Sequence, residues 1–148
     1  MTVRQAKSAD GGLGGQARAQ RSPSLDAAIE KSQRLLGLPP DWDDEGALPI
    51  SEATWRKATG WLRELAKTLL SKRSVTLPVP NISPCADGSI DFLWRTERLK
   101  LLVNIQSGED TESDFYGETT DGLKIKGTFQ PRVHGLEILE TVFSGGLR

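Results

Sequence analysis

The residues with the clearest chemical potential lie in one acidic segment, Asp41–Glu52. Their spacing nearly matches the twelve-residue calcium loop of an EF-hand, which places oxygen ligands at positions one, three, five and twelve and a glycine at position six. The matching residues are Asp41, Asp43, Glu45, Gly46 and Glu52. Their carboxylates would coordinate a hard divalent cation such as calcium.

Two positions count against calcium. Position five is Glu45, which is one methylene longer than the usual Asp or Asn, and position nine is Pro49, which has no side-chain oxygen. A plain connector accounts for the same residues, with solvated carboxylates, Trp42 packed into the core and Glu52 opening a helix. We therefore predict no metal and no cofactor. The alternative is a calcium site formed by Asp41, Asp43, Glu45 and Glu52.

The chain offers few groups for catalysis. It contains one histidine, His134, and one cysteine, Cys85, and no nucleophile stands in a recognisable context beside that histidine. Cys85 also lacks neighbouring cations that would lower its pKa. We predict no catalytic residue and a protein that is not an enzyme. A small hydrolase remains the alternative if carboxylates of Asp41–Glu45 and Glu109–Asp114 converge on one cleft.

Nucleic acid is disfavoured as a partner. Lys and Arg total 19 against 20 Asp and Glu, so no overall positive field attracts phosphate. Lys124, Lys126 and Lys100 could still share a sheet face with Tyr116 and Trp94 and form a local binding site. The aromatic signature of an RNA-binding strand is missing, and lysines commonly protect an edge strand from pairing.

Composition favours one domain in the cytoplasm. A chain of 148 residues with 36% hydrophobic content can bury a core. Its longest apolar run, Leu99–Ile105, is far shorter than the roughly 20 residues of a membrane helix. One cysteine cannot form an intrachain disulfide, and Met1–Pro23 lacks the apolar run of a signal peptide. We expect a soluble protein in a reducing compartment, with no membrane partner.

Two helices are predicted before the sheet. Met1–Pro23 is glycine-rich and poor in apolar residues, which predicts a disordered tail. Ser24 is the expected N-cap of the first helix, and Gly37 ends it in a Schellman-type stop. Ser51 caps the second helix, whose buried stripe includes Trp55, Leu62, Leu65 and Leu69, widened by Trp61 and Leu70. Prolines exclude a helix or a central strand from Ser74–Asp87.

Four segments then alternate apolar and polar residues, as strands with one buried face do. They are Ser89–Arg95, Leu99–Ile105, Asp114–Glu118 and Leu123–Phe129. The last two are joined through Asp121-Gly122, which suits a type I′ turn. We predict an antiparallel meander of order 1-2-3-4. The expected core residues are Trp42, Trp55, Leu62, Leu65, Leu69, Ile90, Phe92, Trp94, Leu101, Val103, Ile125 and Phe129.

The predicted fold class is α+β. Residues 24–148 form a single domain in which two N-terminal helices cover one face of the four-stranded meander. Pro131 is a plausible start for a short C-terminal helix that joins them, with an edge strand over Leu136–Phe143 as the alternative.

Two clusters carry a resemblance. They are Leu38–Asp43 followed by Ala47–Ser51, and Pro80–Pro84 followed by Asp87–Trp94. The pattern resembles a group of small, uncharacterised bacterial proteins in which a tryptophan-bearing turn and Pro-Ile-Ser lead into a helix. In that group a Pro…Asp-Gly-Ser-Ile segment leads into a strand that ends in tryptophan. The resemblance covers roughly Leu35–Ile105 and implies a bacterial or phage-derived origin and an α+β domain, but no reaction.

The functional hypothesis is a non-catalytic bacterial protein-interaction module. Balanced charge, the lack of a catalytic set and a glycine-rich tail of the kind expected to order on binding favour it. Such a module would serve as an accessory or antitoxin-like component of a small operon. Its expected partner is another protein, and a homodimer through a sheet edge remains open.

Overall fold

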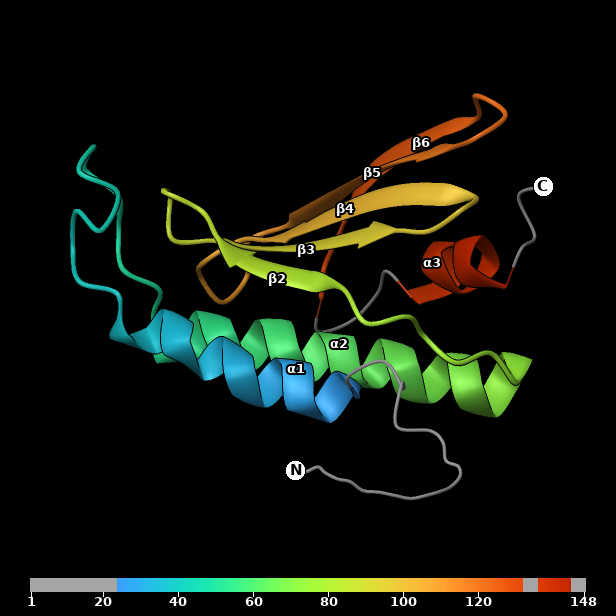
Figure 1. Ribbon diagram of the computed structural model, residues 1–148, viewed down its shortest axis with the longest axis horizontal. Coiled ribbons are helices and arrows are strands. Elements are labelled where there is room, and N and C mark those ends of the chain that lie inside the picture. Colours follow the sequence, from blue (N-terminus) through green and yellow to red (C-terminus); the bar gives the residue numbers. More distant parts are fainter. Residues whose placement is uncertain (1–23, 132–135, 145–148) are drawn as a thin grey trace, which may run out of the picture.

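The computed structural model describes residues 24–131 and 136–144 (Figure 1). The predicted tail, Met1–Pro23, and His134 lie outside these residues. The helices are α1 (Leu25–Lys31), the 3-10 helix η2 (Ser32–Gly37), α2 (Glu52–Arg73) and α3 (Leu136–Phe143). The strands are β2 (Asn81–Pro84), β3 (Ile90–Arg95), β4 (Leu99–Ile105), β5 (Ser113–Thr119) and β6 (Lys124–Phe129). The described part of the chain therefore has the predicted α+β class.

The strands form one antiparallel sheet of order β2-β3-β4-β5-β6. The predicted meander is confirmed for β3 to β6, but the prediction of four strands was wrong, because β2 adds a fifth. The prolines of Ser74–Asp87 do exclude a central strand. They do not exclude a short edge strand, and Pro84 ends β2, where a missing N–H is tolerated.

The core lies between the sheet and the helices, which are gathered on one side of the sheet (Figure 1). Phe92 of β3 faces α2, where it stacks on Trp61 with ring centroids 5.9 Å apart. Trp61 also contacts Phe129 of β6 at 5.4 Å. The predicted core residues that are buried are Leu62, Leu65, Leu69, Ile90, Phe92, Trp94, Leu101, Val103 and Phe129.

Other members of the predicted core are only half-buried, namely Trp42, Trp55 and Ile125. Each tryptophan keeps its indole N–H near polar atoms: Trp42 donates to the Leu48 carbonyl and Trp55 to the Ser32 hydroxyl, both at 2.9 Å. Leu70 was expected to widen the buried stripe of α2 but is 60% exposed. It lies about 100° around the helix from Leu69, on the solvent side.

Both predicted N-caps are confirmed. The Ser24 hydroxyl accepts from Ala27 N at 3.0 Å, and the Ser51 hydroxyl accepts from Thr54 N at 3.0 Å. The Schellman stop at Gly37 was wrong, because α1 ends at Lys31 and η2 continues to Gly37 without a left-handed residue.

The turn between β5 and β6 also differs from the prediction. A type I′ turn needs positive φ at both central residues, but only Gly122 has it, at +95°. Gly122 N donates to the Thr119 carbonyl and Thr119 N to the Leu123 carbonyl. These bonds define a three-residue loop with glycine in the left-handed position.

Leu136–Phe143 is a helix, α3, and not an edge strand. Glu140 is 5% exposed on this helix, and Arg73 at the end of α2 lies 3.7 Å from its carboxylate. Phe143 packs on Trp94 with ring centroids 5.1 Å apart. The predicted helix start at Pro131 cannot be followed, because 132–135 lie outside the described residues.

Candidate protein-interaction surface

The sheet face opposite the helices carries an apolar row at its centre. The strand register aligns one outward residue from each strand, in the order Asn81, Leu93, Leu102, Tyr116 and Lys126. Leu93 and Leu102 are half-buried by their neighbours, and Tyr116 is 44% exposed. α1 and α2 lie on the other side of the sheet (Figure 1). We call these five residues the central row.

A row of charges flanks the central row on each side. On one side the register aligns Arg95, Lys100, Glu118 and Lys124, which we call the basic row. On the other side it aligns Ser83, Asp91, Asn104, Asp114 and Thr128, which we call the acidic row. Three cations and one anion give the basic row a net charge of +2, and two aspartates give the acidic row −2. We call the sheet face opposite the helices the open face. It is apolar at its centre and oppositely charged at its two ends.

Hydrogen bonds hold part of the acidic row in place. Asn104 Nδ2 lies 2.8 Å from both the Ser89 hydroxyl and Asp91 Oδ1, to which it donates. Ser89 is fully buried, and its backbone N–H donates to Asp87 at 3.0 Å. Gln106 Nε2 donates to the Asn104 side-chain oxygen. The position of the Asp91 carboxylate is thus fixed by the strands around it.

Cys85 borders this network, with its Sγ 3.7 Å from Asn104 Nδ2. Burial raises the pKa of the thiol from its usual value near 9.0 to about 11, the Ser89 hydrogen bond opposes that rise, and Asp91 adds to it. The thiol therefore keeps its proton at neutral pH. Because the thiolate is the nucleophilic form, Cys85 is a poor nucleophile at neutral pH.

The acidic loop before α2 uses its carboxylates on its own backbone. Asp41 Oδ1 accepts from Gly46 N at 2.6 Å, and Asp43 Oδ1 accepts from Glu45 N at 2.8 Å and Ala47 N at 3.0 Å. Glu52 instead accepts from Arg56 along α2. Within 24–131 and 136–144, no three His, Cys, Asp or Glu side chains are grouped so that they could hold a metal ion. The four residues of the calcium alternative are therefore not brought together.

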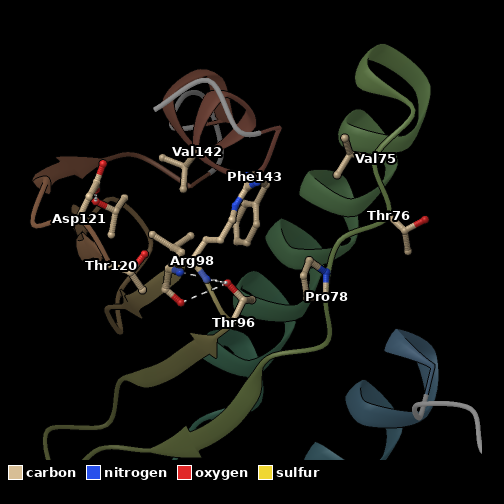
Figure 2. A pocket seen from close by; sticks show the side chains of 11 residues that line it. Val75, Thr76, Pro78, Thr96, Arg98, Thr120, Asp121, Val142 and Phe143 are labelled. Atoms are coloured by element: carbon tan, nitrogen blue, oxygen red, sulfur yellow. Dashed lines mark hydrogen bonds between the residues drawn. The ribbon is translucent and has the colours of Figure 1, made fainter. Parts of the chain in front are cut away.

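The two acidic loops also do not meet in either of two hollows found in the described part of the chain. One, of about 440 Å³, lies at the end of the sheet beneath α3. Figure 2 shows Val142 and Phe143 on one side of it, Thr120 and Asp121 on another, and Val75 and Pro78 opposite. The other lies beside α1 and is lined by residues such as Asp26, Trp55 and Arg63. Neither is lined by a residue of Asp41–Glu45 or Glu109–Asp114.

Of the residues considered for a nucleic-acid site, only Trp94 lies apart from the others. Lys100, Lys124, Lys126 and Tyr116 share the open face. Trp94 is 1% exposed on the opposite face, where its indole N–H donates to the Pro78 carbonyl at 2.7 Å. The aromatic platform on the open face therefore contains Tyr116 without Trp94.

Sequence reasoning missed Leu93 and Leu102 as surface residues. The available signal was a leucine at an outward position in strands that otherwise alternate apolar-in and polar-out.

Comparison with protein-family models, curated proteins and solved structures found no match. The resemblance to small bacterial proteins therefore stays a prediction. Among the described residues, no helix has the length and apolar character needed to cross a bilayer.

Proposed function

We propose that this protein is a non-catalytic interaction module that docks a protein on the open face of its sheet. The observation that supports this most directly is the central row, where Leu93, Leu102 and Tyr116 lie side by side at outward positions. Antiparallel sheets that face water normally carry polar residues there. An apolar centre with a charged rim is the usual anatomy of a protein interface.

The exposed tyrosine supports the same function. Tyrosine buries a large ring at low entropic cost and is enriched among the residues that dominate binding energy. Tyr116 is 44% exposed and lies between Leu102 and Lys126 in the strand register. We place it at the centre of the docking surface.

Of the biological setting, only the bacterial origin comes from the resemblance. An accessory or antitoxin-like component of a small bacterial operon, acting in the cytoplasm, would need a partner surface of this kind and no catalytic site. Docking of this kind requires no cofactor.

Affinity capture with matched variants tests the proposal. The tagged chain, Tyr116→Lys and Leu70→Lys are each purified from the native host, and the proteins captured with them are identified by mass spectrometry. Leu70 is the control, because it is an exposed leucine on the helix side of the molecule. We expect Tyr116→Lys to lose at least tenfold of a partner that Leu70→Lys retains. Circular dichroism establishes that both variants are folded, and equal capture by a folded Tyr116→Lys would contradict the proposal.

A further inference from the structure

We infer that the occupant of the open face is a second copy of this chain, packed face to face about a two-fold axis that runs along the central row. This inference rests on the proposed function and names its partner. The basis of the inference is the arrangement of the central, basic and acidic rows, which allows this face to pair with an identical face.

The outward residues of each central strand are placed symmetrically about the central row. On β3 they are Asp91, Leu93 and Arg95, and on β4 they are Asn104, Leu102 and Lys100. Rotation by 180° about the central row exchanges the two outer rows. It leaves each residue of the central row opposite its own counterpart, as an isologous interface requires.

This rotation brings opposite charges together. Arg95 of each copy faces Asp91 of the other, and Lys100 faces Asn104. The basic row, at +2, lies over an acidic row at −2 at both ends of the interface. A two-fold axis along the strands would instead stack basic on basic and acidic on acidic, so charge selects the first arrangement.

Two kinds of like-charged contact remain, because Glu118 of one copy faces Asp114 of the other and Lys126 of the central row faces its own counterpart. Glu118 lies between Lys100 and Lys124 in the strand register, and these cations offset its charge. We therefore expect the Arg95–Asp91 pairs of β3 to supply most of the electrostatic attraction and Leu93, Leu102 and Tyr116 the apolar contact.

The size of the face predicts a weak dimer. It presents fourteen outward residues, two from β2 and three from each other strand. A stable interface usually uses about 20 to 30 residues on each side. We expect a dissociation constant on the order of micromolar, which weakens further as salt screens the rows.

Sedimentation of the purified full chain over a range of concentrations tests the inference. The wild-type chain should pass from monomer to dimer as concentration rises. Arg95→Asp places two aspartates opposite each other, and Asp91→Arg places two arginines opposite each other, so each variant alone should lose at least tenfold in dimer affinity. A mixture of these two variants should form a heterodimer, because each restores the opposite charge that the other needs.

Two further variants distinguish the loss of this interface from a general effect of charge reversal and from misfolding. Lys67→Asp makes the same kind of charge reversal at an exposed position of α2 and should leave the dimer intact. Since Asp91 accepts a hydrogen bond from Asn104, its replacement could disturb folding. Tyr116→Lys tests the same face without touching that bond and should also give a monomer.

A chain that stays monomeric up to millimolar concentration would overturn the inference. So would a dimer that survives both Arg95→Asp and Tyr116→Lys. If the monomeric chain still captures a different protein through Tyr116, only the second copy is excluded and the proposed function stands. If it captures nothing through Tyr116, both fail.

Discussion

Cys85 directly follows β2 and borders the hydrogen bonds of Asn104. Burial raises the pKa of its thiol to about 11, so at pH 8 the thiolate fraction is about 100-fold lower than for a thiol with a pKa near 9.0. We predict that a disulfide reagent labels the folded chain about 100-fold more slowly than the chain in denaturant at pH 8. The rate in the folded chain should keep rising with pH through about 11. Because Cys85 is the only cysteine, no second site contributes, and equal rates in both states would contradict the raised pKa.

The loop of Asp41 provides a second test on single side chains. Asp41 and Asp43 already accept backbone N–H bonds, while Glu52 pairs with Arg56. We predict that calcium up to about 1 mM, a concentration that covers the affinities of buffer, sensor and extracellular calcium modules, leaves the tryptophan fluorescence unchanged. Trp42 lies inside the loop and would report binding. A saturable change that Asp41→Ala and Glu52→Gln abolish would restore the calcium alternative.

Single residues were predictable where the interaction is local. Ser24 and Ser51 cap their helices through backbone N–H groups three residues away, which the sequence alone reveals. Trp55 is different, because its indole N–H donates to Ser32, 23 residues earlier. A hydrogen-bond partner this distant in the sequence helps to fix where a tryptophan lies, and no periodicity records it.

Among the elements, the β5–β6 hairpin depends on a glycine that leaves room for a neighbouring aromatic ring. Gly127 pairs with Phe115, and a Cβ built on Gly127 would lie 3.0 Å from two atoms of that ring. We predict that Gly127→Val lowers the free energy of unfolding by about 1–3 kcal/mol, the usual range for overpacking. Urea denaturation measures the change.

Thr128→Val is the matched control for that hairpin variant. Thr128 is the next residue of β6, but it points to the open face and is exposed. Its replacement should change stability by less than about 0.5 kcal/mol. Equal effects at both positions would contradict this assignment of the two faces of β6, and a larger effect at Thr128 would mean that they are assigned the wrong way round.

The strands that alternate clearly were found from the sequence, whereas β2 was not. Its four residues contain one buried side chain, Ile82, and end in Pro84, so neither length nor pattern distinguishes β2 from an extended loop. Its existence depends on pairing with β3, a non-local contact. The change from α1 to η2 at Ser32 also coincides with a non-local contact, because the Ser32 hydroxyl donates to the nearby Ile29 carbonyl and accepts from the indole of Trp55.

At the scale of the whole molecule, Trp94 connects the sheet to α3 and to the segment after α2. It is 1% exposed, contacts the rings of Phe92 and Phe143, and donates to the Pro78 carbonyl. We predict that Trp94→Ala lowers stability by about 3–5 kcal/mol and the melting temperature by roughly 10 °C or more. Calorimetry measures both. Leu70→Ala, at an exposed position, is the control, and an unchanged melting temperature for Trp94→Ala would refute the inward orientation of β3.

The open face could be predicted only in part. Alternation shows which side of each strand turns away from the helices, so Lys100, Lys124 and Tyr116 were correctly grouped. Alternation does not show which residues of neighbouring strands lie side by side. The pairing of Leu93 with Leu102 and of Arg95 with Lys100 depends on the strand register. The length of a hairpin loop sets that register only when the turn type is known. The grouping of Tyr116 with Trp94 was wrong, because the alternation of β3 already turns Trp94 toward the helices.

The two edges of the sheet are unequal, and this limits how the protein can aggregate. β2 is short, loses a donor at Pro84 and has η2 packed near it, whereas β6 presents a longer edge in the described part of the chain. If β6 of two chains paired edge to edge, the merged sheet would end at β2 on both sides. Growth by strand addition would then stop at two copies of the protein. The unequal edges therefore protect it from forming fibrils.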